Sequence, residues 1–192
     1  MRFKRTVTTK DIELTKGSIR NRIILKLKTQ KEDDRKKKSR VIETKLFRSK
    51  VFKRAKTVMF YLSFGGEVYT GKMIKEAFNL GKKVVVPICK KNRIIKACVL
   101  SYDSKLQRGP YGILEPVDKE SVRPQDLDLV IVPGVAFDMN GGRLGRGKGY
   151  YDCFLKRLPE NIPTVGLGFD FQILPVVPAT TNDINVTRVI SN

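Results

Sequence analysis

A chain of 192 residues with 41% hydrophobic and 30% charged residues has the size and composition of one folded domain, residues 1–192, with a substantial core. It contains no histidine, which excludes Ser-His-Asp hydrolases, Cys-His proteases and HExxH metalloproteases. Its three cysteines form no CxxC pair, and no apolar run approaches the roughly 20 residues of a membrane helix, so we expect a cytoplasmic protein with reduced thiols and no membrane contact.

Residues 1–56 carry most of the net charge of +20, with 21 Lys or Arg against 6 Asp or Glu. Hydrophobic residues recur there at helical spacing, which predicts two basic amphipathic helices preceded by a flexible extension over residues 1–15. Nucleic-acid binding is one interpretation, but aromatic side chains do not alternate with the cations as stacking platforms do. We therefore favour a solvated basic face. The helical patterns comprise Ile19, Ile23, Ile24 and Leu27, and then Val41, Ile42, Leu46 and Phe47.

The rest of the chain alternates strands and helices, which is typical of an α/β fold with parallel strands. Residues 57–62 and 83–87 are predicted strands, and they flank a helix over residues 70–80 that Thr70 caps and Gly81 ends. Further along, we expect a strand over 94–100, a loop over 107–116, a strand buried on both faces over 129–132, a helix over 150–158 and a strand over 164–168.

The segment GGRLGRGKGYYD, residues 141–152, is typical of a phosphate-binding loop, because glycines let anions approach the backbone and three cations supply positive potential. It is not a Walker motif, since Gly149 stands where the Mg²⁺-binding Ser or Thr belongs, and its glycine spacing does not fit the dinucleotide fingerprint. A flexible surface turn is the alternative. The pair Tyr150-Tyr151 and the following Asp152 favour a binding site instead, at the carboxyl end of the strand over 129–132.

The chain resembles the 5-formyltetrahydrofolate cyclo-ligase family along nearly its whole length. The motifs that carry the resemblance are, in order, Lys16-x-x-x-Arg20, Glu67-Val-Tyr-Thr70, Tyr111-Gly-Ile-Leu-Glu-Pro116, the string PGVAFDMNGGRLGRGKGYYD, and Asn182-Asp183. The resemblance implies a three-layer α/β/α fold with a mostly parallel central sheet, similar to coenzyme A transferase-like folds. It also implies conversion of 5-formyltetrahydrofolate into 5,10-methenyltetrahydrofolate with ATP and Mg²⁺, through phosphorylation of the formyl oxygen.

The resemblance also implies roles for individual residues. Arg146 and Lys148 would be catalytic, and Asp152 and Asp183 would hold Mg²⁺. ATP would contact Lys16, Arg20, Arg143, Leu144, Gly145, Arg146, Gly147, Lys148, Gly149, Tyr150 and Tyr151. The folate would contact Leu62, Glu67, Arg146, Gly147, Lys148, Gly149 and Tyr150, with Glu67 on the N–H edge of the pterin ring.

Each role has a plainer alternative. Lys16 and Arg20 would otherwise be an exposed basic pair, Asp152 a carboxylate at a helix start, and Asp183 part of an Asx turn. Cys153, Asn182 and Tyr69 depart from the residues expected of the family, beside the proposed ligands. A small-molecule kinase and a basic nucleic-acid-binding protein remain alternative functions. We expect a monomer whose partner is a small folate, with or without a polyglutamate tail.

Overall fold

A seven-stranded sheet in the order β11-β10-β7-β1-β2-β3-β6 forms the centre of the computed structural model, which describes residues 9–109, 112–117 and 120–192. The five strands from β11 to β2 are parallel, β3 runs antiparallel to them, and β6 pairs antiparallel with β3 and so runs in the same direction as the five. The strands of this sheet are β1 (Thr57–Met59), β2 (Lys83–Cys89), β3 (Ile95–Leu100), β6 (Ser121–Val122), β7 (Leu129–Val132), β10 (Thr164–Gly168) and β11 (Arg188–Ser191).

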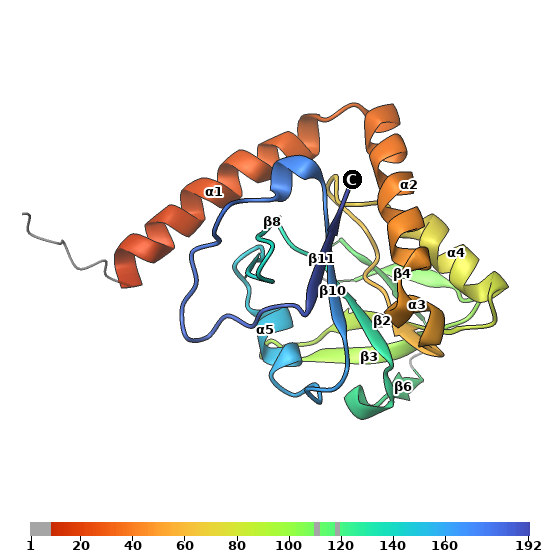
Figure 1. Ribbon diagram of the computed structural model, residues 1–192. Coiled ribbons are helices and arrows are strands. Elements are labelled where there is room, and N and C mark those ends of the chain that lie inside the picture. Colours follow the sequence, from red (N-terminus) through yellow and green to blue (C-terminus); the bar gives the residue numbers. More distant parts are fainter. Residues whose placement is uncertain (1–8, 110–111, 118–119) are drawn as a thin grey trace, which may run out of the picture.

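Helices cover both faces of this sheet, which makes three layers (Figure 1). On one face, α1 to α4 pack over alternate strand residues such as Leu129 and Ile131, while α5 packs over Val130 and Val132 on the other. The alternation follows from the period of two in a strand, so β7 is buried on both sides, as predicted. The helices are α1 (Thr9–Thr29), α2 (Glu32–Arg48), α3 (Lys50–Arg54), α4 (Gly71–Asn79) and α5 (Tyr150–Leu155), with 3₁₀ turns at Pro124–Asp126 and Asp170–Gln172.

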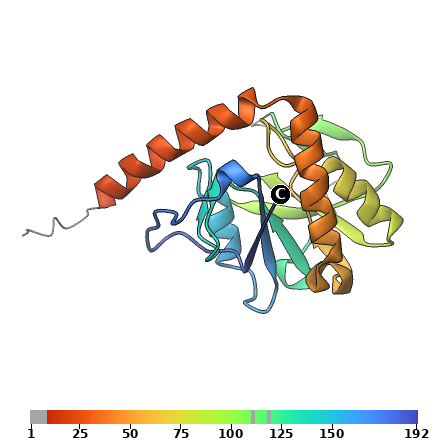
Figure 2. The same ribbon diagram turned by 45° about the horizontal axis from the view of Figure 1, so that its top comes forward.

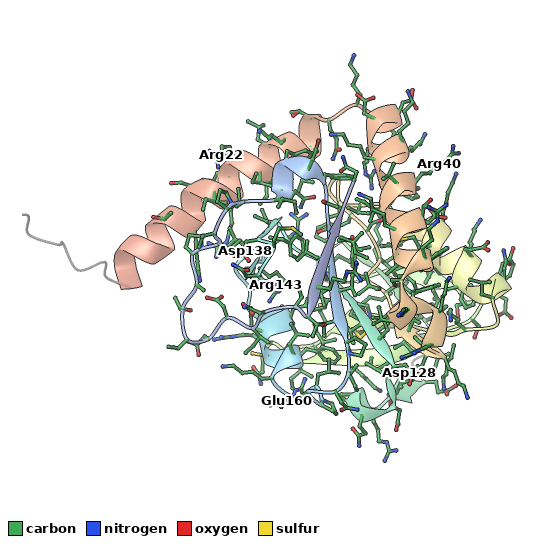
Figure 3. All side chains as sticks on the ribbon, viewed as in Figure 1. Arg22, Arg40, Asp128, Asp138, Arg143 and Glu160 are labelled. Carbon is green, nitrogen blue, oxygen red and sulfur yellow. The ribbon has the colours of Figure 1, made fainter. Side chains whose placement is uncertain are left out.

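The basic N-terminal region forms α1 and α2, which meet at a sharp corner (Figures 1 and 2). Helix α1 begins at Thr9 and so includes residues 9–15 of the predicted extension, while residues 1–8 lie outside the described chain. Arg22 and Arg40 lie on the outer sides of these helices, exposed to solvent (Figure 3). Ile23 and Leu27 of α1 and Ile42 and Leu46 of α2 face the core, whereas Val41, which belongs to the predicted hydrophobic pattern, is exposed.

Other predictions are confirmed or corrected in detail. Gly81 ends α4 with a left-handed backbone (φ 69°), as expected of glycine after a helix. Thr70 does not cap α4 through its side chain; its hydroxyl donates to the carbonyl of Tyr61 (2.7 Å) and accepts from the N–H of Ser63 (3.1 Å). The expected loop over 107–116 contains the strand pair β4 (Leu106–Arg108) and β5 (Leu114–Pro116), with residues 110–111 outside the described chain.

A short hairpin, β8 (Ala136–Phe137) and β9 (Arg143–Leu144), follows β7 and presents the glycine-rich segment. Phe137 is fully buried in a slot where Cβ atoms added at Gly134, Gly166 or Gly168 would lie 2.4–3.0 Å from its ring. Asp138 holds the turn of the hairpin, because its carboxylate accepts from the backbone N–H groups of Asn140, Gly142 and Val177. The hairpin is therefore fixed to the sheet. No helix within the described residues is long and apolar enough to span a membrane.

Candidate active site

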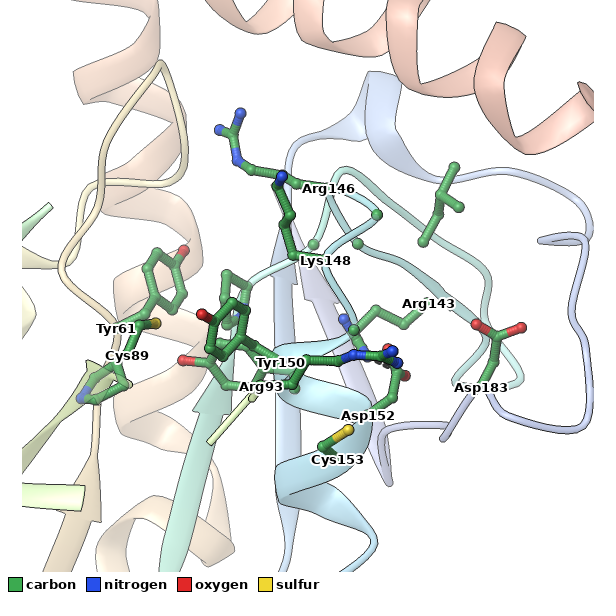
Figure 4. A pocket seen from close by; sticks show the side chains of 18 of the residues that line it. Tyr61, Cys89, Arg93, Arg143, Arg146, Lys148, Tyr150, Asp152, Cys153 and Asp183 are labelled. Carbon is green, nitrogen blue, oxygen red and sulfur yellow. Dashed lines mark hydrogen bonds and ion pairs between the residues drawn. The ribbon is translucent and has the colours of Figure 1, made fainter. Parts of the chain in front are cut away.

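A cavity of about 720 Å³ opens at the carboxyl ends of β1, β2 and β7 (Figure 4). In the sheet, β2 lies on one side of β1 and β7 lies on the other. The order of the strands along the chain therefore reverses between β1 and β7, and the cavity lies at this point. Open α/β sheets bind ligands at this crevice. Every site residue predicted from the sequence lines it: Lys16, Arg20, Leu62, Glu67, Arg143, Leu144, Gly145, Arg146, Gly147, Lys148, Gly149, Tyr150, Tyr151, Asp152 and Asp183.

Helix α1 closes one side of the cavity through two cations one turn apart. Lys16 is only 2% exposed and pairs with Asp183 at 2.6 Å, across 167 residues of sequence. Arg20 donates from Nε to the carbonyl oxygen of Gly145 at 3.0 Å. The alternative of an exposed basic pair is therefore wrong for these two residues, which connect α1 to the glycine-rich segment and to the loop before β11.

The glycine-rich segment has the backbone freedom that its sequence indicates. Gly147 and Gly149 have φ values of 91° and 71°, in the left-handed region that glycine adopts without strain. The backbone N–H groups of residues 146–149 donate to no acceptor within the described protein, and the exposed ammonium group of Lys148 has no partner there. These donors and this cation are free to meet an anion.

Arg143 and Asp152 form a second ion pair at the base of the cavity. Asp152 Oδ1 also accepts from the N–H of Ile184, which places it beside Asp183. Arg143 Nε and the hydroxyl of Tyr151 are buried without a hydrogen-bond partner within the described residues. Burial raises the pKa of the Tyr151 phenol far above its ordinary value, so this group stays a neutral donor. Each of these groups is therefore a buried donor for which the described residues supply no acceptor.

Arg146 connects the glycine-rich segment to the loop after β1. Its guanidinium donates from Nε and a terminal nitrogen to Glu67 Oε1 at 3.3 and 3.1 Å, and it stacks 4.3 Å from the centre of the Phe64 ring. The second oxygen of Glu67 accepts from the N–H of Phe64. Burial raises the pKa of the Glu67 carboxyl, and the opposing attraction of Arg146 does not fully offset it.

The structure also brings residues to the cavity that sequence reasoning missed. Tyr61 and Cys89 lie at one end of Figure 4, and Arg93 reaches across from the turn between β2 and β3 with a left-handed backbone (φ 58°). Glu115 is buried in the wall and accepts from the N–H of Cys89. Of these four residues, only Glu115 has a signal in the sequence, because it belongs to the motif Tyr111-Gly-Ile-Leu-Glu-Pro116, whereas Tyr61, Cys89 and Arg93 are brought to the cavity by the fold.

The carboxylates predicted to hold Mg²⁺ fit a hard divalent cation in part. Asp152 Oδ2 and Asp183 Oδ1 accept no hydrogen bond within the described chain, so each carboxylate keeps one available oxygen. No three His, Cys, Asp or Glu side chains gather into a metal cluster among the described residues. Two carboxylate oxygens suit Mg²⁺, which takes one or two protein ligands and completes its shell with phosphate and water oxygens.

Comparison with known proteins agrees with this geometry. The model of the 5-formyltetrahydrofolate cyclo-ligase family matches residues 12–192. The chain belongs to this family. A probable 5-formyltetrahydrofolate cyclo-ligase from Caenorhabditis elegans is 34% identical over 176 residues, which cover 85% of both chains. The enzyme of Escherichia coli is 34% identical over 142 residues, or 71% of this chain and 78% of its own.

Solved structures confirm the fold. The NMR structure of Aquifex aeolicus 5,10-methenyltetrahydrofolate synthetase is 34% identical, with a TM-score of 0.81 over 91% of this chain and 88% of that one. The Mycoplasma pneumoniae synthetase matches with a TM-score of 0.73 over 92% and 98% of the two chains at 22% identity, which supports the fold alone. The predicted three-layer α/β fold with a mostly parallel sheet is therefore confirmed for this cyclo-ligase family member.

Proposed function

We propose that this protein is an ATP-dependent 5-formyltetrahydrofolate cyclo-ligase, which forms 5,10-methenyltetrahydrofolate, ADP and phosphate. One observation carries the proposal beyond family membership. Arg146 belongs to the cationic segment suited to ATP and at the same time contacts Glu67, on the wall suited to the folate. Because Arg146 contacts both sides of the cavity, it would lie where ATP transfers its phosphoryl group to the folate.

The chemistry explains why such a cavity needs cations and no histidine. The formyl oxygen attacks the γ-phosphorus of ATP, and the bond from that phosphorus to ADP breaks. The N10 lone pair then attacks the formyl carbon, the carbon–oxygen bond breaks with phosphate as the leaving group, and N10 loses its proton to water. Both steps place negative charge on phosphate oxygens, so positioning and charge stabilisation supply most of the acceleration.

The residues around the transferred group divide this work. Lys148 and Arg146 would stabilise the charge that develops on the phosphoryl oxygens, together with the free N–H groups of residues 146–149. Lys16 and Arg20 would hold ATP phosphates from α1. Arg143 and Tyr151 would line the ATP side of the cavity, and Tyr150 would line the junction of the two substrates. Leu62 and Glu67 would contact the folate.

Asp152 and Asp183 would hold Mg²⁺ through the oxygens that accept no hydrogen bond. When bound, this ion neutralises charge on the ATP phosphates. The two carboxylates also act without it, since Asp183 positions Lys16 and Asp152 positions Arg143. We further propose that the enzyme acts in the cytoplasm, where its free cysteines remain reduced.

The test is an assay of the purified protein with 5-formyltetrahydrofolate and Mg·ATP. The expected result is the near-ultraviolet absorbance of the methenyl product, formed in proportion to ADP and abolished when either substrate is omitted. ADP release with a different acceptor and no dependence on folate would instead indicate a small-molecule kinase. Absence of turnover together with tight, salt-sensitive binding of random DNA would indicate a nucleic-acid-binding protein.

A further inference from the structure

Glu115, on β5, is a buried carboxylate in the cavity wall that the proposed reaction leaves unused. The residue is 6% exposed, and its Oε1 accepts from the N–H of Cys89 at 3.3 Å, at the end of β2. Within the described chain, its Oε2 accepts no hydrogen bond, and no Lys or Arg forms an ion pair with it. In a protein with a net charge of +20, a buried acid without a cation is unusual, because desolvating it is costly.

The other buried acid of the cavity, Glu67, is in the opposite situation. Its Oε1 accepts two hydrogen bonds from Arg146, and its Oε2 accepts from the N–H of Phe64. It therefore has a cation and a backbone donor already, whereas Glu115 has one backbone donor and a free oxygen. Both carboxylates line the cavity, but only Glu115 has an oxygen that no described residue engages.

The wall is shaped to house this carboxylate. A Cβ atom added at Gly109 would lie 2.6 Å from the Glu115 carboxyl carbon and 2.7 Å from Oε1, so any larger residue there would displace the carboxyl group from this position. Pro87 and Ile113 line the same cavity and supply apolar surface for a flat ring. A negative, partly apolar wall repels phosphate groups and suits a neutral heterocycle that presents N–H donors.

We propose that Glu115 recognises the donor edge of the folate pterin ring, formed by its 2-amino group and N3–H. This inference rests on the proposed function, and it assigns to Glu115 the contact that the sequence suggested for Glu67. Two adjacent N–H donors match the two oxygens of one carboxylate, and charge-assisted hydrogen bonds of this kind are strong when buried. Glu67 then keeps the separate task of orienting Arg146 beside the formyl group.

The test is Glu115→Gln, which keeps the size of the side chain and an oxygen for the Cys89 N–H but removes the charge. The exposed residue Glu120 provides the matched control, Glu120→Gln. We expect the KM for 5-formyltetrahydrofolate to rise at least about tenfold in Glu115→Gln, with the KM for ATP and the Tm unchanged, and no change in the control.

A purely structural role is excluded by a 2-desamino analogue of the substrate, which lacks half of the donor edge. The wild-type enzyme should bind this analogue at least about tenfold more weakly than 5-formyltetrahydrofolate, while Glu115→Gln should discriminate much less between the two. Equal discrimination in both proteins, or a folate KM unaffected by Glu115→Gln, would overturn the inference. Because the wild-type enzyme is measured in parallel, loss of its cyclo-ligase activity would refute the proposed function separately.

Discussion

The two ends of the cavity differ in charge although one continuous surface lines them. At one end, Lys16, Arg20, Arg143 and Lys148 surround a backbone with free N–H groups. At the other, Glu115 and the neutral phenol of Tyr61 line the wall, and burial holds the pKa of that phenol well above its ordinary value. In the proposed function, such a division would orient the two substrates, since a polyanion would fit one end and a neutral heterocycle the other.

Arg146 and Glu67 form the boundary between these ends, because their ion pair joins the cationic segment to the loop after β1. Because of this pair, the charge of the cavity lining does not simply change from positive at one end to negative at the other. A cation that would otherwise point freely into the anion site is held by an acid from the other side, so its position depends on both halves of the cavity.

Removing the free cation should have the largest effect. Lys148→Ala is expected to lower kcat/KM by about 10²- to 10³-fold, as loss of one preorganised electrostatic group costs roughly 3 kcal/mol of transition-state stabilisation. The Tm should not change, because Lys148 is exposed and has no partner in the described structure. Steady-state kinetics and a melting curve measure both. Lys91→Ala, which removes an exposed cation outside the cavity, is the control, and unchanged turnover in Lys148→Ala would remove this lysine from the mechanism.

The boundary itself is tested by a double-mutant cycle on Glu67→Gln and Arg146→Gln. We expect each variant to lower kcat/KM at least about tenfold, and the pair to be coupled by about 1–3 kcal/mol, because each residue positions the other. Kinetics of the four proteins at saturating ATP give the coupling. Additive losses would show that the two residues act independently and that the cavity has no such boundary.

At the cationic end, Asp183→Asn should weaken activation by Mg²⁺ at least about tenfold, because it removes one anionic oxygen and the partner of Lys16. The measurement is the Mg²⁺ concentration for half-maximal rate, with direct binding of Mg·ATP as a second readout. Asp170→Asn is the matched control, since Asp170 also pairs with a lysine, Lys38, but lies outside the cavity. Equal Mg²⁺ dependence in both variants would argue against Asp183 as a ligand.

The smallest expected effect is on the pH profile. Burial raises the pKa of Glu67, so as pH falls this carboxyl becomes protonated at a pH above the ordinary range near 4.3 and releases Arg146. The acid limb of kcat/KM in the wild type should therefore lie above that range. Because Gln does not ionise, the kcat/KM of Glu67→Gln should not fall with pH along this limb, although its value at neutral pH is lower than that of the wild type. An identical limb in the variant would assign it to another group.

The accuracy of the sequence predictions differed from element to element for physical reasons. The strand over 164–168 and the helix stop at Gly81 were correct, because hydrophobic runs and glycine conformations are local properties. The strand over 57–62 ends at Met59, since the residues after it turn into the loop that carries Leu62 and Glu67. The antiparallel direction of β3 could not be predicted from its own sequence, because the direction depends on its pairing with β2.

For the site, the sequence by itself determined the chemistry: a glycine-rich cationic segment, no histidine and motifs that name the family, all readable from residue types and spacing. Only the tertiary structure decided which groups are free. It buries Lys16 against Asp183 across 167 residues, pairs Glu67 with Arg146 and, among the described residues, gives Glu115 no cation. The burial of a side chain and its ion pairs depend on contacts between segments far apart in the sequence, so no local sequence pattern predicts them.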